Sequence, residues 1–472
     1  MSKTPIINAQ LDAQNEILSR IADKLGAYES PATWAAIQAK VRAGTIGQYV
    51  RPGDQMAVEA AETLSVSVSG TGVTAATVNK DTFLAIAGTH HRDYEFTYDG
   101  AMWHYLGETV TLSDYGITPT GTPAEGDVID VHRTATTYNY DVEGIDEECP
   151  AKPGLTHALS LIMHPVLSQL NFDPPSFLYA VTAAKWPSGM PAGTYTITLN
   201  HGAYNGGTAQ DGTYAFTTTQ TIPVGGGIRH SAIGAYQSGS YTKTQITNGT
   251  FTTYDSDKTT TIETGLATTE SDTGTSLGTT TACDPQYKSD ADYLNFTQRN
   301  AYGSNRWSTS WLRQWLNSDE ASFTWTPATI WSRPGSGVTE GFLHTLDPEL
   351  RAVLGKIRKR YALSIADGYG YEDVEDFVTL DTMLDVGFGA NNSISEGPVR
   401  GGEVTRTTAM SLWQGATNAD RIKYQGTTAR LWWLGSAYPS YAYSERVVST
   451  SGALVDNGAY GSNGVVPRLQ II

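Results

Sequence analysis

The chain has 472 residues, which is long enough for about two to four domains with buried cores. Its formal net charge of −17 argues against a nucleic-acid partner, because on average no basic surface is available to neutralise phosphates. Only 17% of the residues are charged, whereas the chain has 48 Gly, 26 Tyr and 11 Trp. This composition is typical of β-rich extracellular or virion proteins rather than of cytosolic helical enzymes.

The cysteines and the hydropathy pattern indicate the cellular compartment in which the protein is made. Cys149 and Cys283 form neither a CxxC motif nor a disulfide framework, and we expect both to be free thiols. No stretch reaches the ~20 apolar residues of a membrane span, and the opening MSKTPIINAQLDAQ lacks the apolar segment of a signal peptide. We therefore expect synthesis in a cytoplasm and no membrane insertion.

The first predicted element is a helix over residues 1–28. Residues 6–26 carry apolar side chains at the alternating four- and three-residue spacing of a short heptad seam. We predict that this helix oligomerises or docks, and we favour a homotrimer. Clustering would suit a binding protein, because linking weak sites raises overall binding by ~10²–10⁴ without new contacts. The alternative is a helix packed on its own domain.

The middle of the chain predicts a discontinuous main domain with two β-rich insertions. The Asp99-Gly100 hairpin signal lies within alternating apolar and polar residues, which is typical of a small β module. The strand entries AGTYTITL and DGTYAFTT repeat each other before a Thr-rich stretch. The predicted segments are the main domain at 29–61, a β module at 62–136, the main domain again at 137–176, a second β module at 177–282 and a C-terminal domain at 283–472.

The main domain is predicted to contain a few helices and several strands. Ser30 and Pro31 predict the start of a helix over 30–44. The stretch SNRWSTSWLRQWLNS predicts a helix capped by Ser308 or Ser310. DPELRAVLGKIRKRYA predicts another helix, whose last turn would hold the basic run KIRKRY because cations suit the dipole there. The fold class predicted for the whole chain is α+β and β-rich.

Three stretches resemble a known family when they are taken together. YGSNRWSTSWLRQWLNS, FLHTLDPELRAVL and LWWLGSAYPSYAYSERVVSTSGALVDNGAYGSNGVVPRL are similar to the DUF6273 family, which is frequent in phages and gut bacteria. The last stretch also resembles the variable region of proteins that are diversified by phage retroelements. The resemblance implies a C-type-lectin-like fold, related to the formylglycine-generating-enzyme fold, with inserted β-sandwich-like modules and a variable region at 430–472.

The resemblance also implies which residues vary. Diversification at AAC codons yields Tyr, Ser, Asp, Ala, Val, Gly, Thr or His, and this set is common in the closing stretch. Tyr, Ser, Gly and Asn suit binding surfaces, since Tyr gives rigid contact area and the others give adaptable hydrogen bonds. The implied ligand-binding surface consists of Tyr438, Ser440, Tyr441, Tyr443, Ser444, Val448, Ser449, Val455, Asp456, Asn457, Gly458 and Tyr460. The alternative is a set of ordinary turns in a β-rich domain.

We expect burial to distinguish the residues that support this surface from the residues that form it. We expect the apolar residues that lead into the variable region, Trp432, Trp433 and Leu434, to be buried. The tyrosines should instead be exposed side by side, with Tyr438, Tyr443 and Tyr460 as the main examples.

Catalysis by this region is not expected. All nine histidines precede residue 345, so a Ser–His or Cys–His nucleophile in the closing stretch would need a distant partner. Formylglycine-generating relatives need cysteines near the C-terminal end of the fold, and none follows Cys283. Paired carboxylates for glycoside hydrolysis remain an alternative, because their separation cannot be read from a sequence.

No metal or cofactor is predicted. His90, His91 and Asp93 lie close together in THHRDYEF, but adjacent histidines point to opposite sides of a strand and no third ligand is evident. The acidic run YEDVED at 371–376 could bind calcium or could be the acidic start of an element. It lacks a Gly-punctuated ligand loop, so calcium is kept only as an alternative.

The predicted function is that of a non-enzymatic phage virion protein. It would be a tail-associated receptor-binding protein or adhesin, synthesised in the host bacterial cytoplasm and located in the virion. Its partners would be a bacterial surface protein or glycan, other virion proteins and further copies of itself. The alternatives are a structural or decoration protein of the virion and a polysaccharide-degrading tail enzyme.

Overall fold

The computed structural model describes residues 33–59, 63–87, 93–134, 137–199, 212–231, 243–279, 299 and 302–472. The predicted helix at 1–28, the histidines at 90 and 91, and Cys283 lie outside the described residues. The chain divides into two compact units. Unit 1 comprises Met1–Met56, Asn139–Leu343 and Glu349–Ile472, and unit 2 comprises Ala57–Tyr138 and His344–Pro348. Where the chain is described, no helix combines the length and apolarity needed to cross a bilayer.

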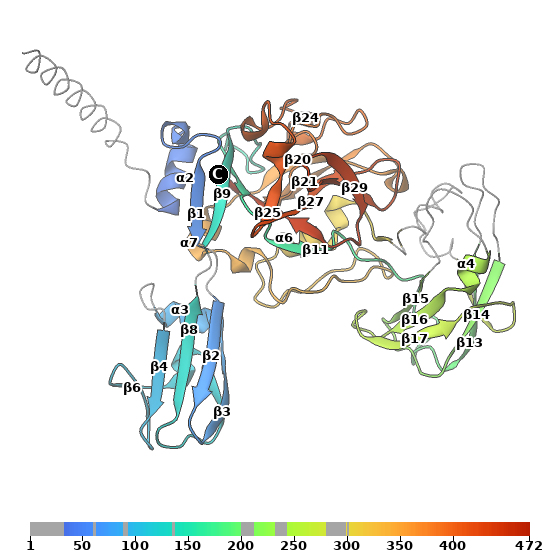
Figure 1. Cartoon of the computed structure of the whole chain (residues 1–472), viewed down its shortest axis with the longest axis horizontal. Helices are drawn as coiled ribbons and strands as arrows, with labels where there is room; N and C mark the ends of the chain where they lie inside the picture. The colour runs from blue at the N-terminus through green and yellow to red at the C-terminus, as the bar shows by residue number, and fades with distance from the viewer. Residues whose placement is uncertain are drawn as a thin grey trace, which may run out of the picture. The chain divides into compact units, whose positions relative to one another are not determined.

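Outside residues 177–282, the described part of unit 1 contains three sheets of four or five strands (Figure 1). The first has the strand order β1 (Gln55–Glu59), β9 (Thr137–Ile145), β10 (Leu159–Met163), β31 (Arg468–Ile471) and β22 (Val378–Thr379). The second has β11 (Ser168–Leu170), β30 (Asn463–Val465), β27 (Trp432–Ala437), β28 (Ser444–Val448) and β29 (Leu454–Gly458). The third has β21 (Tyr371–Asp376), β20 (Ile357–Ala362), β23 (Gly397–Arg400) and β24 (Glu403–Val404). A hairpin of β25 (Lys423–Gln425) and β26 (Thr428–Arg430) accompanies them.

Strands that are far apart in the sequence lie next to each other in these sheets. β31 pairs antiparallel with β10, with Leu159 opposite Ile471, and β11 pairs with β30. Residues from about 140 to 170 therefore complete the sheets that the last 40 or so residues form. The resulting core of unit 1 is dominated by aromatic rings: Trp307, Trp311, Trp432 and Trp433 are each at most 2% exposed.

Residues 177–282 contribute two four-stranded sheets that share one core. The first is β12 (Tyr179–Ala180), β15 (Gly227–His230), β16 (Thr250–Tyr254) and β17 (Thr261–Ala267). The second is β18 (Thr269–Glu270), β14 (Gly212–Thr218), β13 (Gly193–Leu199) and β19 (Thr275–Thr279), and α4 (Lys243–Thr247) lies in the same segment. Phe216 of one sheet stacks on Phe251 of the other at 4.2 Å between ring centroids, so the sheets pack face to face.

Unit 2 is a small β structure with an aromatic core. Its larger sheet has the order β2 (Thr63–Ser69), β8 (Val128–Thr134), β4 (Asp93–Tyr98), β5 (Trp103–Tyr105) and β6 (Glu108–Val110). β3 (Val73–Val78) pairs with β7 (Ile117–Gly121), and α3 (Lys80–Ala87) packs on the same core. The predicted Asp99-Gly100 turn joins β4 to β5, where Asp99 Oδ1 accepts hydrogen bonds from the amides of Ala101 and Met102.

Asp127 organises the loops of unit 2. Its fully buried carboxylate accepts hydrogen bonds from the backbone amides of Thr71, Gly72, Val73 and Ala124. A Cβ on Gly72 would come within 2.6 Å of this carboxylate, so glycine is needed for the close approach. The amide hydrogen bonds, that from Ala124 foremost, lower the pKa of Asp127 to about 2.

We expect Asp127→Asn to destabilise unit 2 at neutral pH, because one amide group would then face a donor rather than an acceptor. A lowered pKa means that the carboxylate stabilises the fold above about pH 3.8 and loses this effect as pH falls toward about 2. The difference between the variant and the parent should therefore shrink across that window. Amide hydrogen exchange of β2 and β8 measures it, and the exposed Asp114→Asn is the control. Equal exchange at neutral pH in both variants would contradict the assignment.

Three helices that the sequence predicted for the main domain are shorter than expected. They are α2 (Trp34–Arg42), α6 (Trp311–Leu316) and α7 (Pro348–Val353). α2 is capped by Thr33, whose hydroxyl accepts a hydrogen bond from the Ala36 amide, while the positions predicted for its start, 30 and 31, lie outside the described residues. α6 is capped by Ser310, one of the two predicted candidates. Short 3₁₀ turns lie at Ile46–Gln48, Leu112–Tyr115, Trp307–Thr309, Leu343–Thr345, Ile365–Asp367, Ser411–Trp413 and Ala419–Arg421.

The basic run KIRKRY does not end a helix, and that prediction was wrong. The run forms most of strand β20, after α7 has ended at Val353. Lys359 is fully buried and pairs with Asp385, whereas Arg360 pairs with Asp373 of the neighbouring strand at 2.7 Å. Neighbouring residues of a strand point to opposite faces, so each cation reaches a different carboxylate. Cys149 is a buried free thiol, as predicted.

Candidate ligand-binding surface

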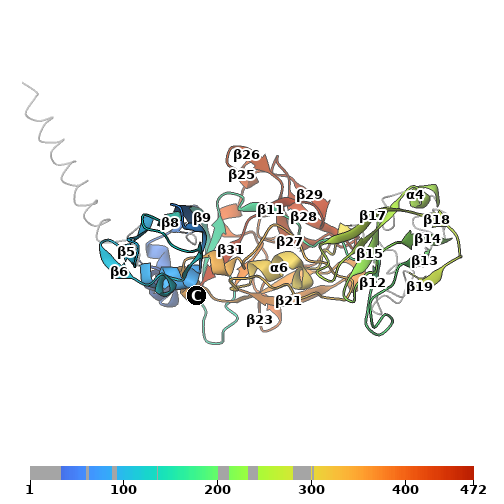
Figure 2. The same ribbon diagram turned by 90° about the horizontal axis from the view of Figure 1, so that it is seen from below.

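The predicted surface is built on the sheet β27–β28–β29, whose strands lie side by side (Figure 2). Trp432, Trp433 and Leu434 of β27 are fully buried, which confirms that part of the prediction. The indole Nε1 of Trp433 donates a hydrogen bond to the Leu170 carbonyl at 2.9 Å, so this buried ring has a polar partner. The loop 438–443 then joins β27 to β28, and the Tyr438 amide donates to the Ser444 carbonyl at 2.9 Å.

Five tyrosines form a continuous row of rings, which we call the tyrosine ladder. Its members are Tyr438, Tyr441, Tyr443, Tyr302 and Tyr460. Successive ring centroids lie 5.0, 5.8, 4.5 and 5.3 Å apart, which is the range for favourable aromatic pairs. The guanidinium of Arg446 lies 4.1 Å from the centroid of the Tyr438 ring and extends the row by one cation–π contact.

The ladder is only partly exposed. Tyr460 is 45% exposed, and Tyr438 and Tyr441 are half-buried. Tyr443 is 6% exposed, so the prediction that it is exposed beside the other tyrosines was wrong. The reason is its place in the row, where the rings of Tyr441 and Tyr302 lie on either side of it. Tyr302 lies outside the closing stretch, and sequence reasoning missed it because nothing local links it to that stretch.

The other predicted surface residues divide by their exposure. Ser440, Val455 and Asp456 are exposed, and Ser449 and Asn457 are partly exposed. Ser444, Val448 and Gly458 are buried, so they do not belong to an accessible surface. Their burial follows from strand pairing, since Val448 lies between Trp432 and Leu454, and Ser444 lies opposite Gly458. The Ser444 hydroxyl donates to Asp456 across the strands at 3.0 Å.

Two distant side chains hold the loop 438–444 in place. The Asn305 amide donates hydrogen bonds to the carbonyls of Tyr438, Tyr441 and Ser444 at 3.3, 2.8 and 2.7 Å. Arg299 Nε donates to the Ala442 carbonyl at 2.8 Å, and its guanidinium pairs with Asp367 at 2.6 Å. These contacts satisfy four carbonyls of the loop, so the tyrosines are presented by a fixed backbone rather than by a mobile one.

Buried carboxylates lie beneath this surface. Burial raises the pKa of Glu396 to about 7 and that of Asp173 to about 7, and it raises the pKa of Glu445 well above the usual range. Glu396 accepts hydrogen bonds from the Ser436 hydroxyl and from the Ala362 amide. Residues 430–472 contain no His and no Cys, so these carboxylates have no nucleophile–base partner of that kind within the closing stretch.

Each carboxylate of the acidic run at 371–376 is paired with an arginine side chain. Four ion pairs account for its carboxylates: Glu372 with Arg306, Asp373 with Arg360, Glu375 with Arg358, and Asp376 with Arg313. A guanidinium beside each carboxylate opposes a bound cation, so this run does not support the calcium alternative. Over the described ranges, no group of three or more His, Cys, Asp or Glu side chains is arranged to hold a metal ion.

The fold and the surface together define a β-rich domain that presents a preorganised row of tyrosines. Residues 289–471 match the family model of DUF6273, a domain of unknown function. The match contains α6, the sheet β27–β28–β29 and the whole tyrosine ladder, so the predicted resemblance to DUF6273 is confirmed for this part of the chain. No curated protein and no solved structure matches the chain.

Proposed function

We propose that the protein is a tail-associated receptor-binding protein of a phage virion, and that the tyrosine ladder binds a bacterial surface ligand. The observation that supports this proposal is the ladder itself, a row of partly exposed rings, three of which lie on a loop whose backbone is fixed by hydrogen bonds. Aromatic side chains dominate binding hot spots, and a fixed backbone lowers the entropy that is lost on binding. The exposed Ser440 and Asp456 add polar groups at the edge of the row.

The resemblance of the closing stretch to diversified phage proteins supports the rest of the proposal. It suggests a C-type-lectin-like fold for the main domain, a variable surface at 430–472 and a location in the virion. We further propose that residues 1–28, which lie outside the described residues, bring several copies together, and that the β modules contact other virion proteins. The proposed activity is binding and not catalysis. The bacterial ligand would be a surface protein or glycan.

The proposal is tested by removing the two rings at the ends of the ladder, Tyr438 and Tyr460. We expect the double variant Tyr438→Ala with Tyr460→Ala to weaken adsorption to host cells by about tenfold or more, because an aromatic hot spot contributes ~2 kcal/mol or more. Each of the two rings packs on a neighbouring ring and Tyr438 is half-buried, so the free energy of unfolding should fall by about 1–3 kcal/mol, the contribution of two aromatic pairs. Cell-binding titration with the purified full chain measures the first effect, and calorimetry measures the second.

Tyr424→Ala is the matched control, because Tyr424 is 47% exposed but lies on β25, outside the ladder. It should adsorb like the parent. A double variant that folds and adsorbs normally would contradict the proposal that the ladder binds the bacterial ligand. Turnover of host polysaccharide by the parent protein would favour the enzymatic alternative instead.

A further inference from the structure

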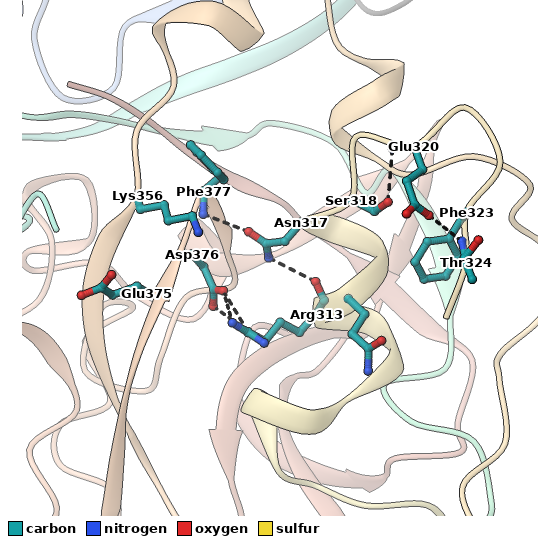
Figure 3. Close-up of a pocket in the computed structure, with 11 residues that line it drawn as sticks. Arg313, Asn317, Ser318, Glu320, Phe323, Thr324, Lys356, Glu375, Asp376 and Phe377 are labelled. Carbon is teal, nitrogen blue, oxygen red and sulfur yellow. Dashed lines mark hydrogen bonds and ion pairs between the residues drawn. The ribbon is translucent and has the colours of Figure 1, made fainter. Parts of the chain in front are cut away.

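A second site is suggested by a cavity of about 310 Å³ that shares no residue with the tyrosine ladder. Arg313 of α6, Phe323 of the following loop, and Lys356 and Phe377 at the edges of β20 and β21 line it, as does Glu320. Figure 3 shows these side chains around a common space. This volume lies at the lower end of the range for small-molecule sites.

The framework of the cavity is fixed by its own hydrogen bonds. Asn317 donates to the carbonyls of Arg313 and Val378 and accepts from the amides of Phe377 and Val378, so its amide joins α6 to the end of β21. Gln314 donates to the Thr326 carbonyl and accepts from the Thr326 amide, both at 2.9 Å, which ties down the following loop. These groups are used in building the cavity and not in holding a ligand.

Asp376 and Arg313 complete the framework. The Asp376 carboxylate is 2% exposed and pairs with Arg313 at 2.7 Å (Figure 3). It also accepts a hydrogen bond from the Trp307 indole at 2.8 Å. The charges of Arg313 and Asp376 therefore neutralise each other, and this pair does not select a charged ligand.

The remaining polar groups surround two aromatic rings. The ammonium group of Lys356 is exposed and lies 5.1 Å from the centroid of the Phe377 ring. Glu320 uses one carboxylate oxygen to accept the Thr324 amide, and Glu375 uses one to pair with Arg358. Within the described part of the chain, the second oxygen of each can accept from a ligand. Phe323 is held edge-on by Trp311 at 6.1 Å between centroids.

We propose that this cavity binds a neutral saccharide ring. The C–H face of such a ring packs on phenyl rings, its hydroxyls donate to carboxylate oxygens, and its oxygens accept from an ammonium group. Since Glu375 is paired with Arg358 and Asp376 with Arg313, the lining charges outside these ion pairs are one carboxylate, Glu320, and one ammonium group, Lys356, which together favour neither an anionic nor a cationic ligand. A ligand without charge but with many hydroxyls satisfies all of these groups at once. This inference goes beyond the proposed function, because the ladder takes no part in it.

Saturation-transfer NMR with the full chain tests the proposal. The probes are glucose, galactose, mannose and N-acetylglucosamine, with glucuronate as an anionic probe and glycine as a zwitterionic one. We expect saturation transfer to at least one neutral sugar and weaker binding of glucuronate and glycine. Lys356→Met should weaken that sugar about tenfold, the effect expected when a charged hydrogen-bond donor is lost. Glu320→Gln should weaken it as well.

Tyr460→Ala is the control that separates this site from the ladder, and it should bind the sugar like the parent. Both Lys356 and Glu320 are exposed, so their variants should melt like the parent. The proposal is overturned if no neutral sugar shows saturation transfer, if glucuronate or glycine binds more tightly, or if Lys356→Met binds the sugar unchanged. Loss of the sugar in Tyr460→Ala alone would place it on the ladder and not in this cavity.

Discussion

Replacing Arg468 with methionine should lower the free energy of unfolding of unit 1 by about 3–5 kcal/mol, the effect expected when one partner of a buried ion pair is removed. Arg468 is fully buried in β31. Its guanidinium pairs with Glu143 and with Glu148, the latter at 2.7 Å, and lies 3.5 Å from Asp381. Methionine fills much of the same volume but removes the guanidinium that pairs with Glu143, while Glu148 keeps Arg406 at 3.6 Å.

The charges around Arg468 balance when one carboxyl is neutral. Burial, and then the charge of Glu143, raises the pKa of Asp381 well above its usual range. Three carboxylates, Glu143, Glu148 and Asp385, then face three cations, Arg468, Arg406 and Lys359. Removal of one cation breaks this balance in a region that water does not reach, which is why the predicted effect is large.

Urea unfolding measured on the full chain checks this prediction. Arg358→Met is the matched control, since Arg358 also pairs with a glutamate but its side chain is 46% exposed. The control should cost no more than about 1 kcal/mol, as is usual for surface ion pairs. If the two variants unfold at the same urea concentration, the stability of unit 1 does not depend on the charge of Arg468.

Replacing Glu396 with glutamine should stabilise unit 1 above neutral pH by up to about 3 kcal/mol. This limit follows from the shift in the pKa of Glu396 from 4.5 to about 7, which is caused mainly by burial. Glutamine keeps the shape and has no charge. Its oxygen can accept from the Ala362 amide, as Glu396 Oε1 does, and its NH₂ group can donate to the Ser436 hydroxyl.

The sign of the pH dependence follows from the direction of the shift. A carboxyl with a raised pKa binds its proton more tightly in the folded state, so the parent loses stability as pH rises from about 4.5 to about 7 and stays level above that. The advantage of Glu396→Gln should therefore be small near pH 4.5 and reach its full size near pH 8. Thermal unfolding at both pH values measures it, with the exposed Glu403→Gln as control. A variant less stable than the parent at pH 8 would show that Glu396 is ionised and needed as such.

The tyrosine ladder shows which features of the candidate site the local sequence could predict. The closing stretch predicted a tyrosine-rich surface after a buried β27, and Trp432, Trp433 and Leu434 are buried as expected. Burial of Tyr443 was not predictable, because it depends on the ring of Tyr302, which lies about 140 residues earlier. The same holds for Asn305, which fixes the loop through carbonyls that no local pattern identifies.

Composition, hydropathy and motifs by themselves determined that the protein is β-rich, that Ser310 could cap α6, and that its C-terminal part resembles DUF6273. These features depend on residue type and near neighbours, which a single sequence displays. Only the tertiary structure decided that KIRKRY is a strand, that Arg468 is buried and that burial raises the pKa of Glu396. Each of these depends on a partner far away in the chain, such as Glu143 for Arg468, because pairing and desolvation arise only when distant strands meet.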